Sequence, residues 1–423
     1  MSRLKPQLGL FQGIAMLATT MLGTGIFVVP AITAEQTGAV SLLAWGVLLI
    51  LTLPIAFTFA ALGKKDPHAG GVPHIVGKAL GRSSERLTAF LFFTILPVGM
   101  PASLVIGSHF VQALIPLNAW QDLLLQLAML AAMFVLGLIG AKASGQLQVL
   151  IAGLIITLVG ALWITMAPHG VDFEVPSLSH AGSLMDALGL MFWCVIGIEA
   201  FSHMGEEFKR PERDFPLALI IGTLVTLFIY WAASVLILKD LPLLAGTPSS
   251  ASLGKMATIH LGPVTGSLVT VLGFFACFAS TNVYVQGYAR LLWSLADEGK
   301  LPRYLAQLNH NKVPVVSLMT ICGLSFIVVI SVWALGLKLP QLLLYTNGNF
   351  VVIYLLAMIA GVIMLKGLQR LVALLAAIVT FIFCYSLGQS ISYVIYLSIA
   401  FLIAVKLWQL FKHLGQNASQ QNN

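Results

Sequence analysis

The stretch "MLGTGIFVVP", Met21 to Pro30, decides how this chain folds. It lies inside a long apolar run, yet Gly23, Thr24 and Gly25 stand at the middle of that run. Backbone that leaves the helix at membrane depth is tolerated only where it is buried in protein or lines a polar cavity. Small residues also serve close helix packing in membranes, which is the simpler alternative. The stretch therefore raises the prediction of a broken membrane helix beside a cavity.

The composition requires a lipid environment. The 423 residues are 59% hydrophobic and 9% charged, with a mean hydropathy of +0.96. A soluble domain carries about 25% charged residues, so this chain has too few to cover a water-facing surface. Apolar runs of about 20 residues cross the ~30 Å hydrocarbon core as helices. We expect an all-α membrane protein with twelve transmembrane helices, near residues 8–34, 40–62, 87–114, 122–141, 147–167, 184–203, 216–238, 263–292, 314–335, 341–364, 370–387 and 391–410.

The connections between these runs are too short to hold a separate domain. Residues 1–410 are therefore expected to form one transmembrane domain, followed by a polar tail at 411–423. The first apolar run is much longer than the 7–15 residues typical of a signal peptide, and no cleavage pattern follows it. We expect the first helix to remain in the protein.

Lys and Arg residues indicate the orientation, since short loops rich in them stay cytoplasmic. If the N-terminus is cytoplasmic, all but three of the 22 Lys and Arg residues fall on the cytoplasmic side, the exceptions being Lys239, Lys255 and Lys338. The alternation predicts an even number of helices and cytoplasmic N- and C-termini. The net charge of +7 then reflects orientation and attraction to the anionic lipid bilayer. The basic residues are scattered over loops, which argues against nucleic acid as a partner.

A second irregular segment occurs five helices after the first. "FWCVIGIEAFSHMGEEFKRPERDFP", Phe192 to Pro216, has Gly197 and Glu199 within an apolar run. Many transporters consist of two inverted repeats with broken helices in corresponding positions, and an offset of five reverses the direction of each partner. The spacing fits a five-plus-five inverted repeat with broken helices 1 and 6, in which repeat one spans about 8–167, repeat two about 184–364, and two extra helices about 370–410.

Four stretches together resemble one known family. They are "LGTGIFVVP", "PHAGGVPHIVGKALG" after helix two, "FWCVIGIEAF...EEFKRPERDFP", and "FACFASTNVYVQGYARLLWSLADEGKLP" in helix eight. In order and spacing they resemble the amino acid/polyamine/organocation (APC) superfamily, and most of all its short bacterial exporters of methionine and branched-chain amino acids. The resemblance implies the five-plus-five fold, amino-acid transport and a place in the bacterial inner membrane.

The two irregular segments then suggest how an amino acid is held. The N–H groups that start the outer half of helix one favour a carboxylate, and free carbonyls at the ends of the inner half-helices can accept from an ammonium. The positions expected to bind the main chain of the substrate are Thr20, Met21, Gly23, Thr24, Gly25, Ile26, Trp193, Cys194, Ile196 and Gly197. The positions expected to form an uncharged pocket for the substrate side chain are Pro101, Ala102, Phe192, Trp193, Cys194, Ile196 and Tyr284. For Trp193, a gate over the substrate and simple packing between helices both remain open.

Coupling to an ion rests on fewer residues. Glu199 is the one acid deep within a predicted span, and intramembrane carboxylates are usually functional; hydrogen bonding to the unwound backbone is its alternative role. Some relatives carry a coupling lysine in helix five, where this chain has Ile155. Ser280 and Thr281 could hold a cation together with helix-one carbonyls, or could hydrogen-bond between helices. We expect proton antiport, which would drive the substrate outward.

Other classes of protein lack support in the sequence. Metalloprotease and serine hydrolase motifs are absent, so no enzyme activity is expected. The four cysteines have no paired spacing and no histidine cluster near them, and no metal or cofactor is expected. His68 and His74 are expected to be solvated or packed. An importer or exchanger of the same fold stays open, as does a membrane amino-acid sensor.

Overall fold

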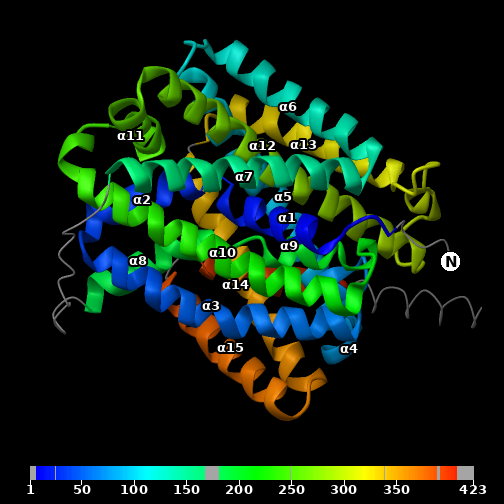
Figure 1. Cartoon of the computed structure of the whole chain (residues 1–423). Coiled ribbons are helices and arrows are strands. Elements are labelled where there is room, and N and C mark those ends of the chain that lie inside the picture. The colour runs from blue at the N-terminus through cyan, green and yellow to red at the C-terminus, as the bar shows by residue number, and fades with distance from the viewer. Residues whose placement is uncertain are drawn as a thin grey trace, which may run out of the picture.

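The protein is almost entirely helical (Figure 1). A computed structural model describes residues 6–23, 25–166, 181–247, 249–337, 339–387 and 391–406. Within these ranges the one extended pairing is an isolated parallel β-bridge between Leu8 and Phe208. The helices are α1 (Leu10–Leu22), α2 (Gly25–Thr37), α3 (Val40–Lys65), α4 (Gly71–Leu80), α5 (Arg82–Gln112), α6 (Ala119–Ile139), α7 (Ala141–Met166), α8 (Ala181–Met191), α9 (Ile198–Ser202), α10 (Pro211–Asp240), α11 (Ser252–Leu261), α12 (Pro263–Asp297), α13 (Val315–Leu335), α14 (Leu339–Met364) and α15 (Gly367–Ser386).

Nine helices of the described chain are long and apolar enough to cross a membrane, or ten spans if α1 and α2 count as one. The prediction of an all-helical, multi-span membrane protein is thereby confirmed. Two shorter apolar helices, Ala187–Ser202 and Ile391–Lys406, lie within the sixth and twelfth predicted spans. The sequence patterns missed α4 and α11, because helices of ten residues are too short to produce a transmembrane hydropathy signal.

The first predicted span bends at the glycines of the opening stretch. α1 ends at Leu22 and α2 starts at Gly25, and their axes differ by 44°. Gly23 has φ +28°, a backbone conformation that side chains rarely permit. Thr24 lies outside the described residues.

The sixth predicted span is also irregular. α8 is followed by a 3-10 turn at Phe192–Val195, then by Ile196 in an extended conformation, and α9 starts at Ile198. Gly197 joins the two parts with φ +135°. Residues that bear side chains strongly disfavour this region, so the glycine permits the chain to change direction there.

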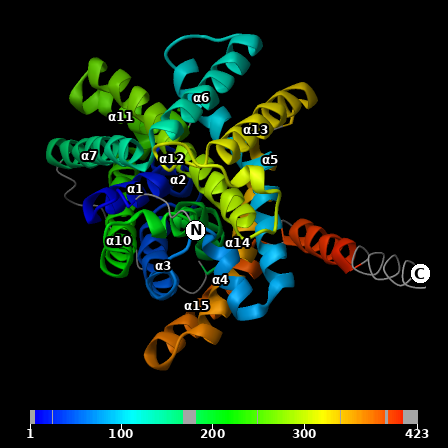
Figure 2. The same cartoon turned by 90° about the vertical axis from the view of Figure 1, so that its right-hand side faces the viewer.

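The irregular segments lie inside the bundle, and long helices surround them. Viewed along the spans, α6, α7, α13 and α15 stand at the periphery (Figure 2). Their outer faces carry exposed apolar side chains such as Ile164 and Leu371, as expected for surfaces in contact with lipid. α10 packs tightly on α1 and α3: a Cβ at Gly63 would lie 2.2 Å from the Phe215 ring. The bundle therefore buries both irregular segments.

Candidate functional site

A narrow cavity lies between the two irregular segments. α1, α2, α5, α12, α14 and the 3-10 turn contribute to its wall. About 50 Å³ inside it is open to the centre of a water-sized sphere, enough for a few water molecules, since one needs about 10–15 Å³. The cavity is therefore narrow. The predicted residues that line it are Thr20, Met21, Gly23, Gly25, Trp193, Ile196, Ser280, Thr281 and Tyr284.

The two irregular segments touch each other beside this cavity. A Cβ at Gly197 would lie 3.1 Å from the Thr20 side chain and 3.2 Å from that of Met21. A Cβ at Gly25 would lie 3.6 Å from Cys194 Sγ. The segments approach this closely because glycine stands on each of them, and residues of both segments consequently line one small cavity.

Glu199 is held at the second irregular segment by three hydrogen-bond donors. Gly197 N–H donates to Glu199 Oε2 at 2.9 Å, and the Tyr284 hydroxyl donates to Oε1 at 3.0 Å. The Tyr354 hydroxyl donates to Oε2 and also to Val195 O, the latter at 3.0 Å. The carboxyl group is fully buried. It ties the start of α9 to α12 and α14, so both of the roles considered for Glu199 have a structural basis.

Several predicted site residues do not line the cavity. Phe192 packs against the rings of Tyr354 and Phe383 instead. Ala102 packs with Val332 and Leu342. The other predicted residues that are buried but not among the lining ones are Ile26, Pro101, Cys194 and Gly197, while Thr24 is outside the described residues.

Other residues line the cavity that the sequence reasoning missed. They are Ile95, Gly99, Met100, Ser103, Cys277, Tyr288, Thr346 and Phe350. Residues three or four apart share one helix face, so on α5 the face of Gly99 and Ser103 meets the cavity while Pro101 and Ala102 point elsewhere. The same spacing from Tyr284 leads to Tyr288. Helical phase was the signal that could have found these residues.

Ser280 and Thr281 lie beside the first irregular segment. Ser280 donates to Thr20 O at 2.8 Å, which links α12 to the end of α1. Thr281 donates to Cys277 O within its own helix. On α7, Gln148 rather than Ile155 connects these elements: its side chain donates to Ala279 O at 2.9 Å, and its own backbone carbonyl accepts from a threonine of α1. A buried neutral amide therefore stands next to Ser280.

Comparison with known proteins identifies the family of this chain. The sequence pattern of the family described as "Amino acid permease" matches residues 8–406. The chain belongs to the amino acid permease family. This permease is 41% identical to the L-methionine/branched-chain amino acid exporter YjeH of Escherichia coli K12, over 97% of both chains. It is 28% identical to the uncharacterized amino acid permease YecA of Bacillus subtilis, over 83% of both. It is also 25% identical to the putrescine transporter PotE of Escherichia coli K12, over 84% of this chain and 81% of that one. It is a multi-pass membrane transporter and not an enzyme.

A buried ion pair joins two elements of the permease at one end of the bundle. Arg290 on α12 bonds to Glu207, which follows α9, and both side chains are 6% exposed. Arg290 also donates to Gln286 at 3.2 Å. The neighbouring Glu206 accepts from Ala69 N–H at 3.1 Å. Glu207 is therefore paired in a buried position.

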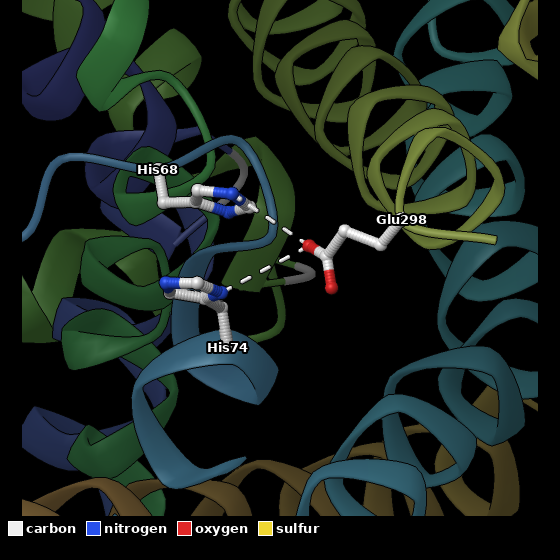
Figure 3. Close-up of side chains that lie close together, drawn as sticks. All are labelled: His68, His74 and Glu298. Carbon is white, nitrogen blue, oxygen red and sulfur yellow. Dashed lines mark ion pairs between the residues drawn. The ribbon is translucent and has the colours of Figure 1, made fainter. Parts of the chain in front are cut away.

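A second cluster at the same end contains two histidines and an acid (Figure 3). The rings of His68 and His74 are stacked, with centroids 3.6 Å apart and planes 6° apart. Glu298 Oε1 lies 3.6 Å from His68 Nε2 and 3.9 Å from His74 Nδ1. Asp66 holds the far side of His74, with Oδ2 3.0 Å from Nε2. The cluster connects α4 and the segment before it with the end of α12.

This arrangement does not suit a metal ion as it stands. An ion at the usual 2.0–2.1 Å from two imidazole nitrogens lies close to both ring planes, and the two stacked planes here are parallel and separated. His68 Nδ1 accepts from Gly70 N–H at 3.0 Å, so a neutral His68 carries its proton on Nε2 and has no lone pair there. The three side chains form a polar cluster in this geometry, with the Glu298 carboxylate within 4 Å of both imidazole rings.

The protonation of the cluster follows from burial and from its charges. Burial, together with the nearby charge of His74, lowers the pKa of His68 to about 4. The hydrogen bond from His74 holds the pKa of Asp66 well below its usual range, with the Lys78 ammonium adding to the effect. His68 is therefore neutral and Asp66 ionised near pH 7.

Proposed function

We propose that this permease is a secondary active exporter of neutral apolar amino acids, methionine and the branched-chain amino acids among them, in the bacterial inner membrane. One observation carries the proposal: among the described residues, none that lines the cavity between the irregular segments is charged. A cationic side chain buried in such a cavity would lack a partner, at a cost of several kcal/mol. The naming of YjeH as an exporter of methionine and branched-chain amino acids supports the same substrate class.

The main chain of the substrate would bind to the backbone of the two irregular segments. α2 starts at Gly25 beside the cavity, and the first N–H groups of a helix have no partner within it. They would receive the carboxylate. The carbonyls of Thr20 and Met21 already accept one bond each, and the second lone pair of each would accept from the ammonium. Trp193 would close over the bound amino acid.

Proton antiport would act through Glu199. Its carboxyl group bridges the second irregular segment and two neighbouring helices, so a change in its charge would alter the hydrogen bonds that hold that segment. Ser280 and Thr281 stay the alternative site for another cation. Because the proton gradient points inward, antiport would drive the amino acid out of the cell.

The same proposal includes the topology. The ten long spans and the helices Ala187–Ser202 and Ile391–Lys406 would make twelve crossings, arranged as a five-plus-five inverted repeat with two extra helices. Both termini would then be cytoplasmic. α4 lies at the end of the bundle where α1 starts (Figure 1). Glu207, the partner of Arg290, accepts from the N–H groups of Gln7 and Leu8 just before α1, and this end would face the cytoplasm. The ion pair would help to close the inner side.

Flux measured in reconstituted liposomes tests the function. We expect liposomes loaded with radiolabelled methionine, leucine, isoleucine or valine to lose the label faster when they contain the permease and when the outside is acidic. Lysine, arginine, glutamate and putrescine should show no such acceleration. Transport of lysine or putrescine ahead of leucine would overturn the substrate class. Acceleration only by an acidic lumen would favour an importer, a rate independent of pH an exchanger, and binding without flux a sensor.

The carboxylate anchor is tested separately with leucine methyl ester. Esterification removes the charge that the start of α2 would bind, at a cost of about 1.5–3 kcal/mol for a hydrogen bond to a charged group. We therefore expect the ester to compete with leucine at least about tenfold less well. Equal competition by the ester and the free acid would place the carboxylate elsewhere.

A further inference from the structure

The last three carbonyls of α1 are bonded by side chains from other helices. The hydroxyl of Ser280 on α12 donates to Thr20 O. The hydroxyl of Tyr230 on α10 lies 2.8 Å from Met21 O and 3.3 Å from Leu22 O, and it donates to both. A helix end leaves such carbonyls unpaired, and inside a membrane no water replaces the missing partner. One tyrosine hydroxyl therefore satisfies the two carbonyls immediately before the break.

Tyr230 is itself held in place from two sides. Its ring stacks on Trp45 of α3, with centroids 4.9 Å apart and planes at 13°, and the side chain is fully buried. The thiol of Cys194, in the second irregular segment, is a neighbour of the Tyr230 hydroxyl beside Gly25. The hydroxyl consequently contacts both irregular segments although it does not line the cavity.

The Tyr230 hydroxyl also occupies the place where residue 25 would carry a side chain. A Cβ at Gly25 would lie 2.1 Å from Tyr230 Oη, a distance that no real contact permits. The next atoms are Tyr230 Cζ at 3.2 Å and Cys194 Sγ at 3.6 Å, which an alanine can accommodate with a shift of a few tenths of an ångström. The hydroxyl alone thus requires glycine at the start of α2.

We propose that Tyr230 is the positioning residue of the first helix break. Its hydroxyl holds the Met21 carbonyl at the end of α1 and leaves room only for a glycine at the start of α2, so that both groups lie where they line the cavity. The role as an aid to amino-acid binding rests on the proposed function; the role in shaping the break does not.

The test combines Gly25→Ala with Tyr230→Phe, which removes the hydroxyl and keeps the ring on Trp45. We expect Gly25→Ala to lower transport of L-leucine into liposomes more than tenfold and to lower the thermal unfolding midpoint of the purified protein. Tyr230→Phe alone should raise KM several-fold while the maximal rate stays within about twofold. The double variant should return to the activity and midpoint of Tyr230→Phe. A double variant as inactive as Gly25→Ala would overturn the proposal, and so would an unaffected Gly25→Ala.

Gly99 provides the matched control. It also lines the cavity, and a Cβ there would meet the side chains of Ile95, at 2.9 Å, and Thr346 instead of the Tyr230 hydroxyl. Tyr230→Phe should therefore leave the defect of Gly99→Ala unchanged. If the double variant recovered the unfolding midpoint but not the KM of Tyr230→Phe, the hydroxyl would only exclude a side chain at residue 25. That result would overturn its positioning role. The thermal unfolding midpoint is measured without substrate. It therefore tests the contact between the Tyr230 hydroxyl and residue 25 even if the wild-type protein transports no neutral amino acid.

Discussion

Glu199 is a carboxyl group surrounded by donors of two kinds, and this decides how a substitution acts. At Oε2 the backbone N–H of Gly197 can only donate, whereas at Oε1 the hydroxyl of Tyr284 can rotate and accept instead. A glutamine therefore fits in one orientation, with its oxygen toward Gly197 and its NH₂ toward Tyr284. Glu199→Gln changes the ability to titrate and leaves the shape of the site.

We expect Glu199→Gln to keep amino-acid exchange between compartments of equal pH and to lose the acceleration by a pH gradient. Exchanging charged for neutral hydrogen bonds costs about 1 kcal/mol, so exchange should fall by no more than about fivefold. In the same liposomes, counterflow measures the exchange at equal pH, and gradient-driven flux measures the acceleration by the pH gradient. Parallel loss of both would make Glu199 structural. Intact gradient-driven transport would move the coupling to another group.

Single residues of the site were only partly predictable from the sequence. Gly23, Gly25 and Gly197 stand out in apolar runs, and they lie at the irregular segments as the pattern indicates. The reason for Gly25 was not readable, since the Tyr230 hydroxyl that excludes a side chain there comes from a helix 209 residues after Met21. Contacts at such separations arise from packing and leave no local pattern. The partners of Glu199 are hidden for the same reason.

At the scale of elements, the pair of Arg290 with Glu207 joins α12 to the segment after α9. Removing one partner of a buried pair costs about 3–5 kcal/mol, whereas replacing both with apolar side chains is close to neutral. We expect Arg290→Met to lower the thermal unfolding midpoint strongly, and the added change Glu207→Leu to restore most of it. Both variants are measured on purified protein, together with leucine flux.

Lys78→Met is the matched control for the ion pair. Lys78 bonds to Asp66 but its side chain is 50% exposed, and exposed pairs contribute only about 0–1 kcal/mol. Its replacement should change the midpoint little. If the midpoint of the double variant fell by the sum of the decreases caused by Glu207→Leu and Arg290→Met separately, the two residues would not act as a pair.

The long elements were predictable because hydropathy reports them directly. α3, α10 and α12 each fall on a predicted span. α4 and α11 were not predictable, because helices of ten residues that pack at the ends of the bundle carry no transmembrane hydropathy signal. On α5, the choice of Pro101 and Ala102 placed the wrong face on the cavity, because adjacency in sequence was used where helical phase decides.

For the whole molecule, the cluster around His68 predicts how stability depends on pH. The pKa of His68 is lowered to about 4 from an ordinary value near 6.5, so the unfolded chain binds more protons between these values. Stability should therefore fall as the pH drops from about 6.5 to 4, and stay unaffected by His68 above 6.5. The lowered pKa of Asp66 makes stability depend on pH only below about pH 3.8, the ordinary pKa of an aspartate.

His68→Asn tests this dependence, because the amide oxygen can still accept from Gly70 N–H and does not titrate. We expect the variant to flatten the fall of the unfolding midpoint between pH 6.5 and 4. His310→Asn, at an exposed histidine, should leave the slope as it is. An equal slope in His68→Asn and wild type would assign the dependence to other groups.

The bond from Tyr230 to the end of α1 also has a consequence for biosynthesis. The donor and the acceptor are separated by 209 residues, and a ribosome adds about 5–20 residues per second. The first half-helix therefore enters the membrane roughly 10–40 s before its partner exists. Throughout that time its terminal carbonyls must be hydrated or shielded by the insertion machinery, so the first segment of this chain is completed only when α10, the seventh predicted span, arrives.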